Sequence, residues 1–161
     1  MAEIPYLRMQ RDLSETMDAP VWPDGVHLAD FAENQAEEAH ALLELAYRDG
    51  GGSVPAFGKW WPRLSQDDEY DLKLCFAVRS RDGSLIGFAQ CWTSGFVKDF
   101  VVHPHYRGHG IGRALLLHIF NAFRERGASV VALKVETGNS SGAAAFYERL
   151  GMSRGGGIEF A

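Results

Sequence analysis

The sequence predicts an α/β fold built around a mixed β-sheet. Its hydrophobic patterns run in the order strand, helix, three strands, helix, strand, helix, and this alternation is typical of α/β domains. The three consecutive strands are separated by short turns, which favours an antiparallel meander. With 161 residues, of which 46% are hydrophobic, the chain is large enough to bury one full core.

The first strand and helix of the pattern follow a linker-like segment. Residues 26–31 read as a strand, and Asn34 with Glu37 three positions later resembles a capping box that opens a helix. The apolar face of this helix is formed by Ala39, Leu42, Leu43, Ala46 and Tyr47. Glycines at 50–52 are expected to end it, because glycine is the favoured residue after a helix C-terminus.

The middle of the chain contains an irregular segment and a meander. Residues 53–71 show no clear period and predict a short helix and a loop. Strands are predicted over residues 74–79 and 85–92, which flank an Asp-Gly turn typical of a β-hairpin. Residues 96–102 are expected to pair next, as the third strand of the meander.

The last third of the chain repeats the helix and strand pattern. Residues 111–126 carry apolar side chains at helical spacing, and a buried strand is predicted over residues 130–135. A final helix is expected to be capped by Ser140 or Ser141 and to end at Gly151.

Charge and composition exclude several function classes. The formal net charge is −5 and the acidic residues are dispersed, which argues against general binding to nucleic acid or to an anionic membrane. The N-terminus is polar and charged, and no long uncharged apolar run occurs, so neither a secretory signal nor a transmembrane span is predicted. The expected location is the cytoplasm.

Cysteines and clustered histidines give no metal-site pattern. Cys75 and Cys91 lie in apolar, strand-like surroundings without metal-ligand spacing, so buried thiols are predicted. His103, His105 and His109 lie on one loop without further ligands to complete a coordination shell. Solvated loop histidines and no metal ion are therefore expected.

The most informative segment lies between the third meander strand and the following helix. Glycines at 108, 110 and 112 allow the backbone to approach a ligand closely. The first turn of the helix offers unpaired N–H groups at the positive end of its dipole. This pattern predicts a binding site for a pyrophosphate group, although the glycines could also merely permit a turn and close helix packing.

Two other phosphate-binding patterns fit the segment less well. A P-loop would place Lys and then Ser or Thr after the last glycine, where this chain has Arg113 and Ala114. A dinucleotide fingerprint would need glycine at 113 and would begin directly after the strand, although Glu136 later in the chain resembles its ribose-binding acid. A dinucleotide-binding protein is kept as a minor alternative.

Two ordered motifs resemble those of the GNAT superfamily of N-acyltransferases. Residues 107–112 read Arg-Gly-His-Gly-Ile-Gly after Val-His-Pro and are similar to the Arg/Gln-x-x-Gly-x-Gly/Ala signature of that family. Residues 139–152 resemble its downstream element, which opens with an asparagine and carries a tyrosine, here Tyr147, on a helix. The resemblance covers about residues 24–155.

The resemblance implies one GNAT domain over residues 1–161, with 1–24 as an N-terminal extension, and acetyl-CoA as the acyl donor. The family fold has three layers, about four helices and a mixed sheet that splays between its fourth and fifth strands. The pantetheine arm lies in that opening, and the loop amides hold the pyrophosphate. The residues that the resemblance assigns to donor binding are Phe100, Val101, Val102, Arg107, Gly108, His109, Gly110, Ile111, Gly112, Arg113, Ala114, Asn139 and Tyr147.

Acylation of an amine needs a base for the amine and an acid for the departing thiolate. Asp99 is the candidate base, and Tyr147 matches the tyrosine that acts as the acid in many GNAT enzymes. The N–H of Val102 is expected to contact the oxyanion. Structural alternatives exist for both side chains, because Tyr147 could pack beside Phe146 and Asp99 could be a buried residue paired with backbone.

The two ends of the chain depart from the family pattern. Residues 153–161 can supply one strand but hardly the usual final hairpin. Residues 5–13 resemble the closing strand of the first half in tandem GNAT proteins such as the mycothiol synthases. We expect residues 5–13 to pair into the sheet as its missing last strand, either within the same chain or by exchange in a homodimer.

The acceptor pocket is expected among residues 47–70, Gln90, Trp92 and the chain ends. Aromatic side chains there could attract an ammonium group, and the acidic run 67–69 an amine, or they could be core packing and a solvated face. The aromatic candidates are Phe57, Trp60 and Trp61. The predicted activity is acetyl transfer to a primary amine of a small molecule or peptide, and the alternative is a non-catalytic acyl-CoA-binding module.

Overall fold

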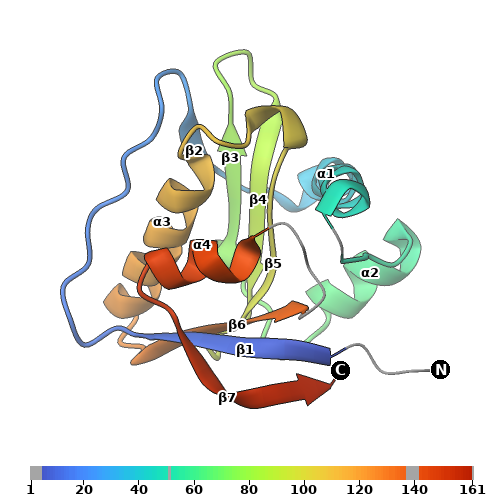
Figure 1. The fold of residues 1–161 in the computed structure, drawn as a ribbon. Coiled ribbons are helices and arrows are strands. Elements are labelled where there is room, and N and C mark those ends of the chain that lie inside the picture. The colour runs from blue at the N-terminus through green and yellow to red at the C-terminus, as the bar shows by residue number, and fades with distance from the viewer. Residues whose placement is uncertain (1–4, 51, 137–141, 161) are drawn as a thin grey trace.

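The computed structural model describes residues 5–50, 52–136 and 142–160, which form two adjoining sheets with four α-helices packed against them (Figure 1). One sheet has the strand order β2-β3-β4-β5 and the other β6-β1-β7. This confirms the predicted α/β class. In chain order the elements are β1 (Pro5–Asp12), β2 (His27–Asp30), α1 (Ala36–Gly50), α2 (Phe57–Ser65), β3 (Cys75–Arg79), β4 (Leu85–Cys91), β5 (Val97–Val102), α3 (Ile111–Glu125), β6 (Val130–Glu136), α4 (Ala143–Arg149) and β7 (Ser153–Phe160).

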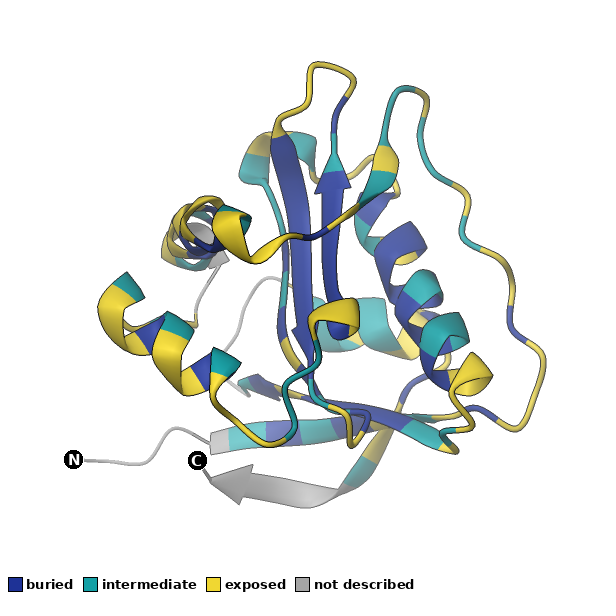
Figure 2. Cartoon of the chain, turned by 180° about the vertical axis from the view of Figure 1, so that it is seen from behind, coloured by how far each residue is buried: buried dark blue, intermediate teal, exposed yellow. Residues whose placement is uncertain are grey.

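Helices cover both faces of the four-stranded sheet, which gives the three layers of the predicted fold (Figures 1 and 2). Alternate residues of β3 enter different cores, because successive side chains of a strand point to opposite faces. Phe76 and Val78 pack with α3, whereas Ala77 packs with α1 and α2. Every residue of β4 is buried between the two layers, as the dark blue strand in Figure 2 shows.

The N-terminal strand β1 lies between β6 and β7 and is antiparallel to both. Its register places Leu7 opposite Val135 and Met9 opposite Leu133, and all four side chains are buried. Residues 5–12 thus pair into the sheet within the same chain, as expected, but as the central strand and not as the last one, because β7 takes the outer position. After β1 the chain runs along α3, where the Leu13 carbonyl accepts a bond from Arg124 Nε at 3.2 Å.

The two sheets meet at one point and separate from there. Phe96 forms a parallel bridge with Ala132, and the N–H of Ala132 donates to the Gly95 carbonyl at 3.0 Å. Gly95 has φ +94°, and a Cβ added to it would lie 2.7 Å from the Val130 carbonyl oxygen. Only glycine allows this close approach. Beyond the bridge β5 is an edge strand. Counted without β1, β5 is the fourth strand and β6 the fifth, so the predicted splay between these two strands is confirmed.

Two predicted helix starts differ from the structure. The capping interaction before α1 joins the Ala32 N–H to Gln35 Oε1 at 3.2 Å, because a 3₁₀ turn over Glu33–Gln35 begins the helical segment earlier than expected. The predicted pair of Asn34 and Glu37 was therefore wrong. Gly142, in the left-handed region, stands at the N-cap of α4 in place of the predicted serine, and Ser140 and Ser141 lie outside the described residues.

No helix within the described ranges combines the length and the apolar character that crossing a bilayer requires.

Candidate functional site

The splay between β5 and β6 opens into a cleft of about 860 Å³. Side chains and backbone from β5, the loop before α3, β6 and α4 line it, together with the end of α1 and Tyr6 of β1. This volume lies in the range of small-molecule binding sites. The cleft is therefore the candidate site, and it brings residues from both halves of the chain together.

The N-terminus of α3 presents backbone donors to this cleft. Gly108 and Gly110 have φ of +80° and +88°, a region that non-glycine residues rarely enter, and Gly110 is the N-cap of the helix. The first intrahelical bond runs from the Ala114 N–H to the Gly110 carbonyl at 3.1 Å. The N–H groups of residues 111–113 precede it and have no acceptor within the helix. They form a positive site suited to an anion.

Gly112 has a different role from the other two glycines of the loop. A Cβ at this position would lie 3.3 Å from Cζ of Phe146 in α4, tighter than ordinary contact. Its backbone φ lies outside the left-handed region. Gly112 therefore allows α4 to pack closely on the first turn of α3, which fixes one boundary of the cleft.

Arg107 connects the glycine loop to its surroundings. Its Nε donates to the Val102 carbonyl at 3.3 Å, and its NH2 group donates to the Ala46 carbonyl at 3.4 Å. Because these bonds reach the end of β5 and α1, the side chain holds the loop in place. Arg113 is half exposed and lies 3.6 Å from Asp18 of the linker.

Asp99 is buried at the base of the cleft and accepts two side-chain bonds. The hydroxyl of Tyr47 donates to Oδ1 at 2.7 Å, and Lys98 Nζ lies 3.2 Å from Oδ2. Lys98 can reach its neighbour because it is the extra residue of a bulge in β5, between Val97, which pairs with Cys91, and Asp99. The two recorded partners of Asp99 are side chains, so the structure does not have the alternative in which Asp99 pairs with backbone.

Tyr47 was predicted as part of the apolar face of α1 and as the first residue of the acceptor-pocket region 47–70. Burial, and then the negative charge of Asp99, raise the pKa of its hydroxyl well above the usual range. The hydroxyl therefore stays protonated and acts as a hydrogen-bond donor to Asp99 at neutral pH. Helical periodicity placed this residue on the correct face but carried no information on a partner 52 positions away.

Tyr147 of α4 lies on the other side of the cleft. Its ring makes contacts with Phe100 at 6.2 Å and Phe146 at 5.3 Å between centroids. Burial raises the pKa of its hydroxyl to about 12, so the phenol is protonated at neutral pH. The packing that was weighed as an alternative role is present, and it holds the ring at the cleft surface.

Most of the residues assigned to donor binding line this one cleft. Asn139 lies outside the described residues, and the N–H of Ala114 is already used within α3. Those that line the cleft are Phe100, Val101, Val102, Arg107, Gly108, Gly110, Ile111, Gly112, Arg113 and Tyr147. His109 does not line it; its Nδ1 lies 3.3 Å from the Arg107 carbonyl.

The cleft also contains charged residues that the sequence did not assign to donor or acceptor binding, although Glu136 was noted for the dinucleotide alternative. Lys134 of β6 places its Nζ 4.7 Å from the ring centre of Tyr6 in β1. Glu136 and Arg149 line the cleft as well. The alternation of β6 could have placed Lys134 and Glu136 on the face opposite the buried valines, but only the insertion of β1 shows that this face borders the site.

The aromatic residues proposed for the acceptor pocket belong instead to packing around α2. Trp60 is buried, and its ring lies beside those of His40 and Trp61. Neither Phe57 nor Trp61 lines the cleft. The aromatic spacing in this segment reflects one buried helix face, because α2 presents its apolar side to α1 and the sheet.

The two cysteines are the buried thiols that the sequence predicts, and His103 and His109 form hydrogen bonds with neighbouring backbone. Cys75 and Cys91 are buried and free, and burial raises the pKa of the Cys75 thiol to about 12. His103 Nδ1 accepts a bond from the His105 N–H at 3.1 Å. Across the described ranges, no group of three or more His, Cys, Asp or Glu side chains is placed to hold a metal ion.

Comparisons with known proteins agree with this architecture. The family model described as "Acetyltransferase (GNAT) family" matches residues 36–152. A mycothiol acetyltransferase of Thermobispora bispora is 35% identical over 164 residues, covering 91% of this chain and 53% of that protein. A streptothricin acetyltransferase of Streptomyces lavendulae is 34% identical over 116 residues, covering 69% of this chain and 57% of that protein.

The crystal structure of a GCN5-related N-acetyltransferase from Sphaerobacter thermophilus is similar to this fold, with a TM-score of 0.80 at 24% identity. The alignment covers 96% of this chain and 50% of that one. The chain thus spans about half the length of several proteins that it matches.

Proposed function

Because the chain belongs to the GNAT family of acetyltransferases, we propose that it is an N-acetyltransferase that uses acetyl-CoA and a primary amine of a small molecule or peptide. The observation that carries this proposal is the cleft itself. It combines free amides at the start of α3 with a protonated phenol, Tyr147, and a buried carboxylate, Asp99. Direct acyl transfer needs these three elements and no nucleophile on the protein.

The donor is expected to bind along the wall formed by β5 and α3. The amides of residues 111–113 and the cations Arg113 and Arg149 suit the pyrophosphate and phosphate groups of CoA. The amides of the pantetheine arm suit the open edge of β5, because an edge strand presents backbone donors and acceptors to an added chain. This arrangement would direct the thioester toward Val102 and Tyr147.

The chemistry requires two proton transfers. The acetyl thioester supplies the electrophilic carbonyl carbon, which the neutral amine attacks to form the amide bond as the carbon–sulfur bond breaks. Asp99, directly or through a water, would take the proton that the amine loses. Tyr147 would give its proton to the departing sulfur, because its raised pKa keeps the phenol protonated at neutral pH. A backbone N–H at the end of β5, that of Val102, would stabilise the oxyanion.

The pairing of Asp99 supports the base assignment. Tyr47 and Lys98 fix the orientation of the carboxylate, and the buried position limits competition from water. Tyr47 and Lys98 are positioning residues in this proposal, since they act on the substrates through Asp99.

The test is acetyl transfer from acetyl-CoA to a panel of primary amines, with release of the CoA thiol as the readout. Asp99→Asn should lower kcat on the order of 100-fold, whereas the control Asp24→Asn, an exposed residue of the turn before β2, should leave it unchanged. The thermal midpoints of both variants show whether the fold is kept. Acetyl-CoA binding without release of thiol to any amine would support the non-catalytic alternative and contradict the proposal.

A further inference from the structure

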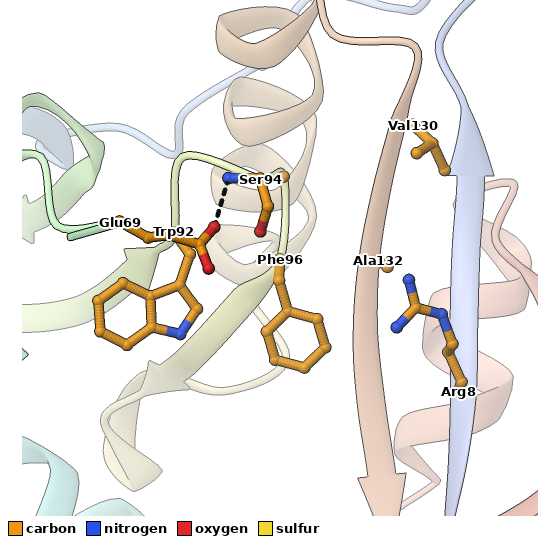
Figure 3. Close-up of a pocket in the computed structure, with 8 residues that line it drawn as sticks. Arg8, Glu69, Trp92, Ser94, Phe96, Val130 and Ala132 are labelled. Carbon is orange, nitrogen blue, oxygen red and sulfur yellow. Dashed lines mark hydrogen bonds between the residues drawn. The ribbon is translucent and has the colours of Figure 1, made fainter. Parts of the chain in front are cut away.

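A second cavity, of about 270 Å³, lies where the two sheets meet (Figure 3). It has room for roughly nine water volumes, at about 30 Å³ each. Its lining residues are Arg8, Glu69, Trp92, Ser94, Gly95, Phe96, Val130 and Ala132. Two of these residues, Glu69 and Trp92, belong to the region in which the sequence predicts the acceptor pocket, whereas the proposed mechanism does not use this cavity.

The second cavity continues the large cleft along three strands. On β1 Tyr6 lines the cleft and Arg8 the cavity, and on β6 Lys134 lines the cleft and Ala132 the cavity. Residues two apart on a strand share one face, so the two sites lie on the same face of the β6-β1-β7 sheet. Phe96, just before β5, lines the cavity, and Asp99, three residues later and beyond the bulge at Lys98, lines the cleft.

Arg8 is the central observation. Its side chain is half buried, and Figure 3 shows it directed from β1 toward Ala132 and the cavity. Within the described part of the chain it makes no hydrogen bond, ion pair or ring contact. A half-buried guanidinium without a counter-charge is costly, and a carboxylate is the partner that its planar fork fits best.

Glu69 provides the opposite charge on another wall of the same cavity. Its Oε1 accepts the Ser94 N–H at 3.0 Å, which fixes the carboxylate, and its Oε2 has no recorded partner among the residues described (Figure 3). Trp92 and Phe96 add aromatic surface to the cavity lining. The cavity therefore offers one site for an anion and one for a cation.

The geometry points to an α-amino acid head as the ligand, and we propose that this cavity binds the head of an amino-acid acceptor that carries a second, distal amine, as lysine does. The carboxylate would pair with Arg8 and the α-ammonium with Glu69, while the distal amine extends along β5 toward Asp99. Because the cavity and the cleft lie on the same face of the β6-β1-β7 sheet, a side chain that leaves the cavity can run toward the cleft. This substrate class rests on the proposed function, whereas the binding of the head to the cavity can be tested without it.

The first experiment measures binding to the full chain, with L-lysine as the probe and 1,5-diaminopentane, which lacks the carboxylate and so cannot pair with Arg8, as its comparison. Calorimetric titration should show tighter binding of L-lysine, on the order of 10-fold or more. Arg8→Gln should remove most of that preference, and Arg63→Gln, an exposed arginine of α2, should keep it. Equal binding of the two probes, or a preference that survives Arg8→Gln, would overturn the proposal.

The second experiment separates this proposal from the proposed function. With acetyl-CoA present, L-lysine should be acetylated at its distal amine, and the ratio of kcat/KM for L-lysine to that for 1,5-diaminopentane should fall on the order of 10-fold in Arg8→Gln. Arg8-dependent lysine binding without any acetyl transfer would keep the cavity assignment and contradict the proposed function. Acetyl transfer to amines at rates that do not depend on a carboxylate would keep the proposed function and contradict the cavity assignment. Thermal midpoints of the variants show whether each one keeps its fold.

Discussion

The two walls of the cleft use different parts of the chain. At the start of α3 the chemistry belongs to the backbone, because Gly108 and Gly110 orient the loop and the free amides follow directly. Along β5 and α4 it belongs to side chains, namely Asp99, Tyr47 and Tyr147. Changes at the start of α3 should therefore affect donor binding, and changes along β5 and α4 should affect the rate of acetyl transfer.

Deleting residues 1–14 should have the largest effect, because β1 is the central strand of the sheet that holds β6, and β6 lines the cleft. The deletion removes the central strand of β6-β1-β7 together with the buried Leu7, Met9 and Leu13. The loss should reach about 5 kcal/mol or more, comparable to the whole stability of a domain. Circular dichroism with temperature measures it. A melting temperature equal to that of the full chain would show that the walls do not depend on β1.

Tyr147→Phe tests the proton donor on the wall formed by the side chains of β5 and α4. It should lower kcat on the order of 100-fold, since the departing thiolate loses its proton donor, while the Kd for acetyl-CoA changes little. Steady-state kinetics and calorimetry measure the two quantities. The matched control is Tyr70→Phe, whose hydroxyl bonds Glu33 outside the cleft and should not affect kcat. An undiminished kcat in Tyr147→Phe would reduce this tyrosine to a packing residue.

Gly95→Ala tests the contact at which the two sheets meet before they separate. The added methyl would meet the Val130 carbonyl at 2.7 Å in a backbone conformation that alanine disfavours, so unfolding stability should fall by about 2–4 kcal/mol. Gly83→Ala has the same backbone problem but open space around it and should cost only about 1–2 kcal/mol. Urea unfolding measures both variants. Equal losses would mean that close contact of the sheets is not needed.

Gly110→Ala tests the backbone wall. A side chain at φ +88° should distort the N-cap of α3, which raises the KM for acetyl-CoA on the order of 10-fold with little change in kcat. Gly127→Ala, at φ +84° after the other end of the same helix, should cost similar stability without changing this KM. A lowered kcat with unchanged KM would break the division between the walls.

The pH dependence should show the smallest effect. In the proposed mechanism Tyr147 acts as its protonated form, and burial raises its pKa to about 12. Activity should therefore pass the ordinary phenol pKa of about 10 without a decline attributable to this group. A pH profile of kcat measured up to about pH 10.5 checks this. A decline centred near pH 10 that is absent from Tyr147→Phe would contradict the raised pKa.

The backbone wall could be predicted from sequence because its signal is local. Glycine spacing and the start of an amphipathic helix lie within one short segment, and both concern backbone conformation. That residues 5–13 form a strand of the sheet could also be predicted from their resemblance to a strand of tandem GNAT proteins, but their place between β6 and β7 could not. These features need no knowledge of which distant residues meet.

The side-chain wall could be predicted only in part. Asp99 and Tyr147 were identified, but the bond from Tyr47 depends on how α1 crosses β5, and the position of Lys98 depends on a bulge. Trp60 shows the opposite error, because an aromatic residue of the core has the same local pattern as one in a pocket. The pairing of β1 with β6, which brings Arg8 beside Ala132, is likewise a tertiary fact.

The central claim is that the cleft between β5 and β6 binds acetyl-CoA. Calorimetric titration of the full chain with acetyl-CoA, and with NAD as the control ligand, tests it most directly. Saturable binding of acetyl-CoA at about one per chain, with none for NAD, is the predicted result. No binding of acetyl-CoA, or binding of NAD alone, would contradict the account.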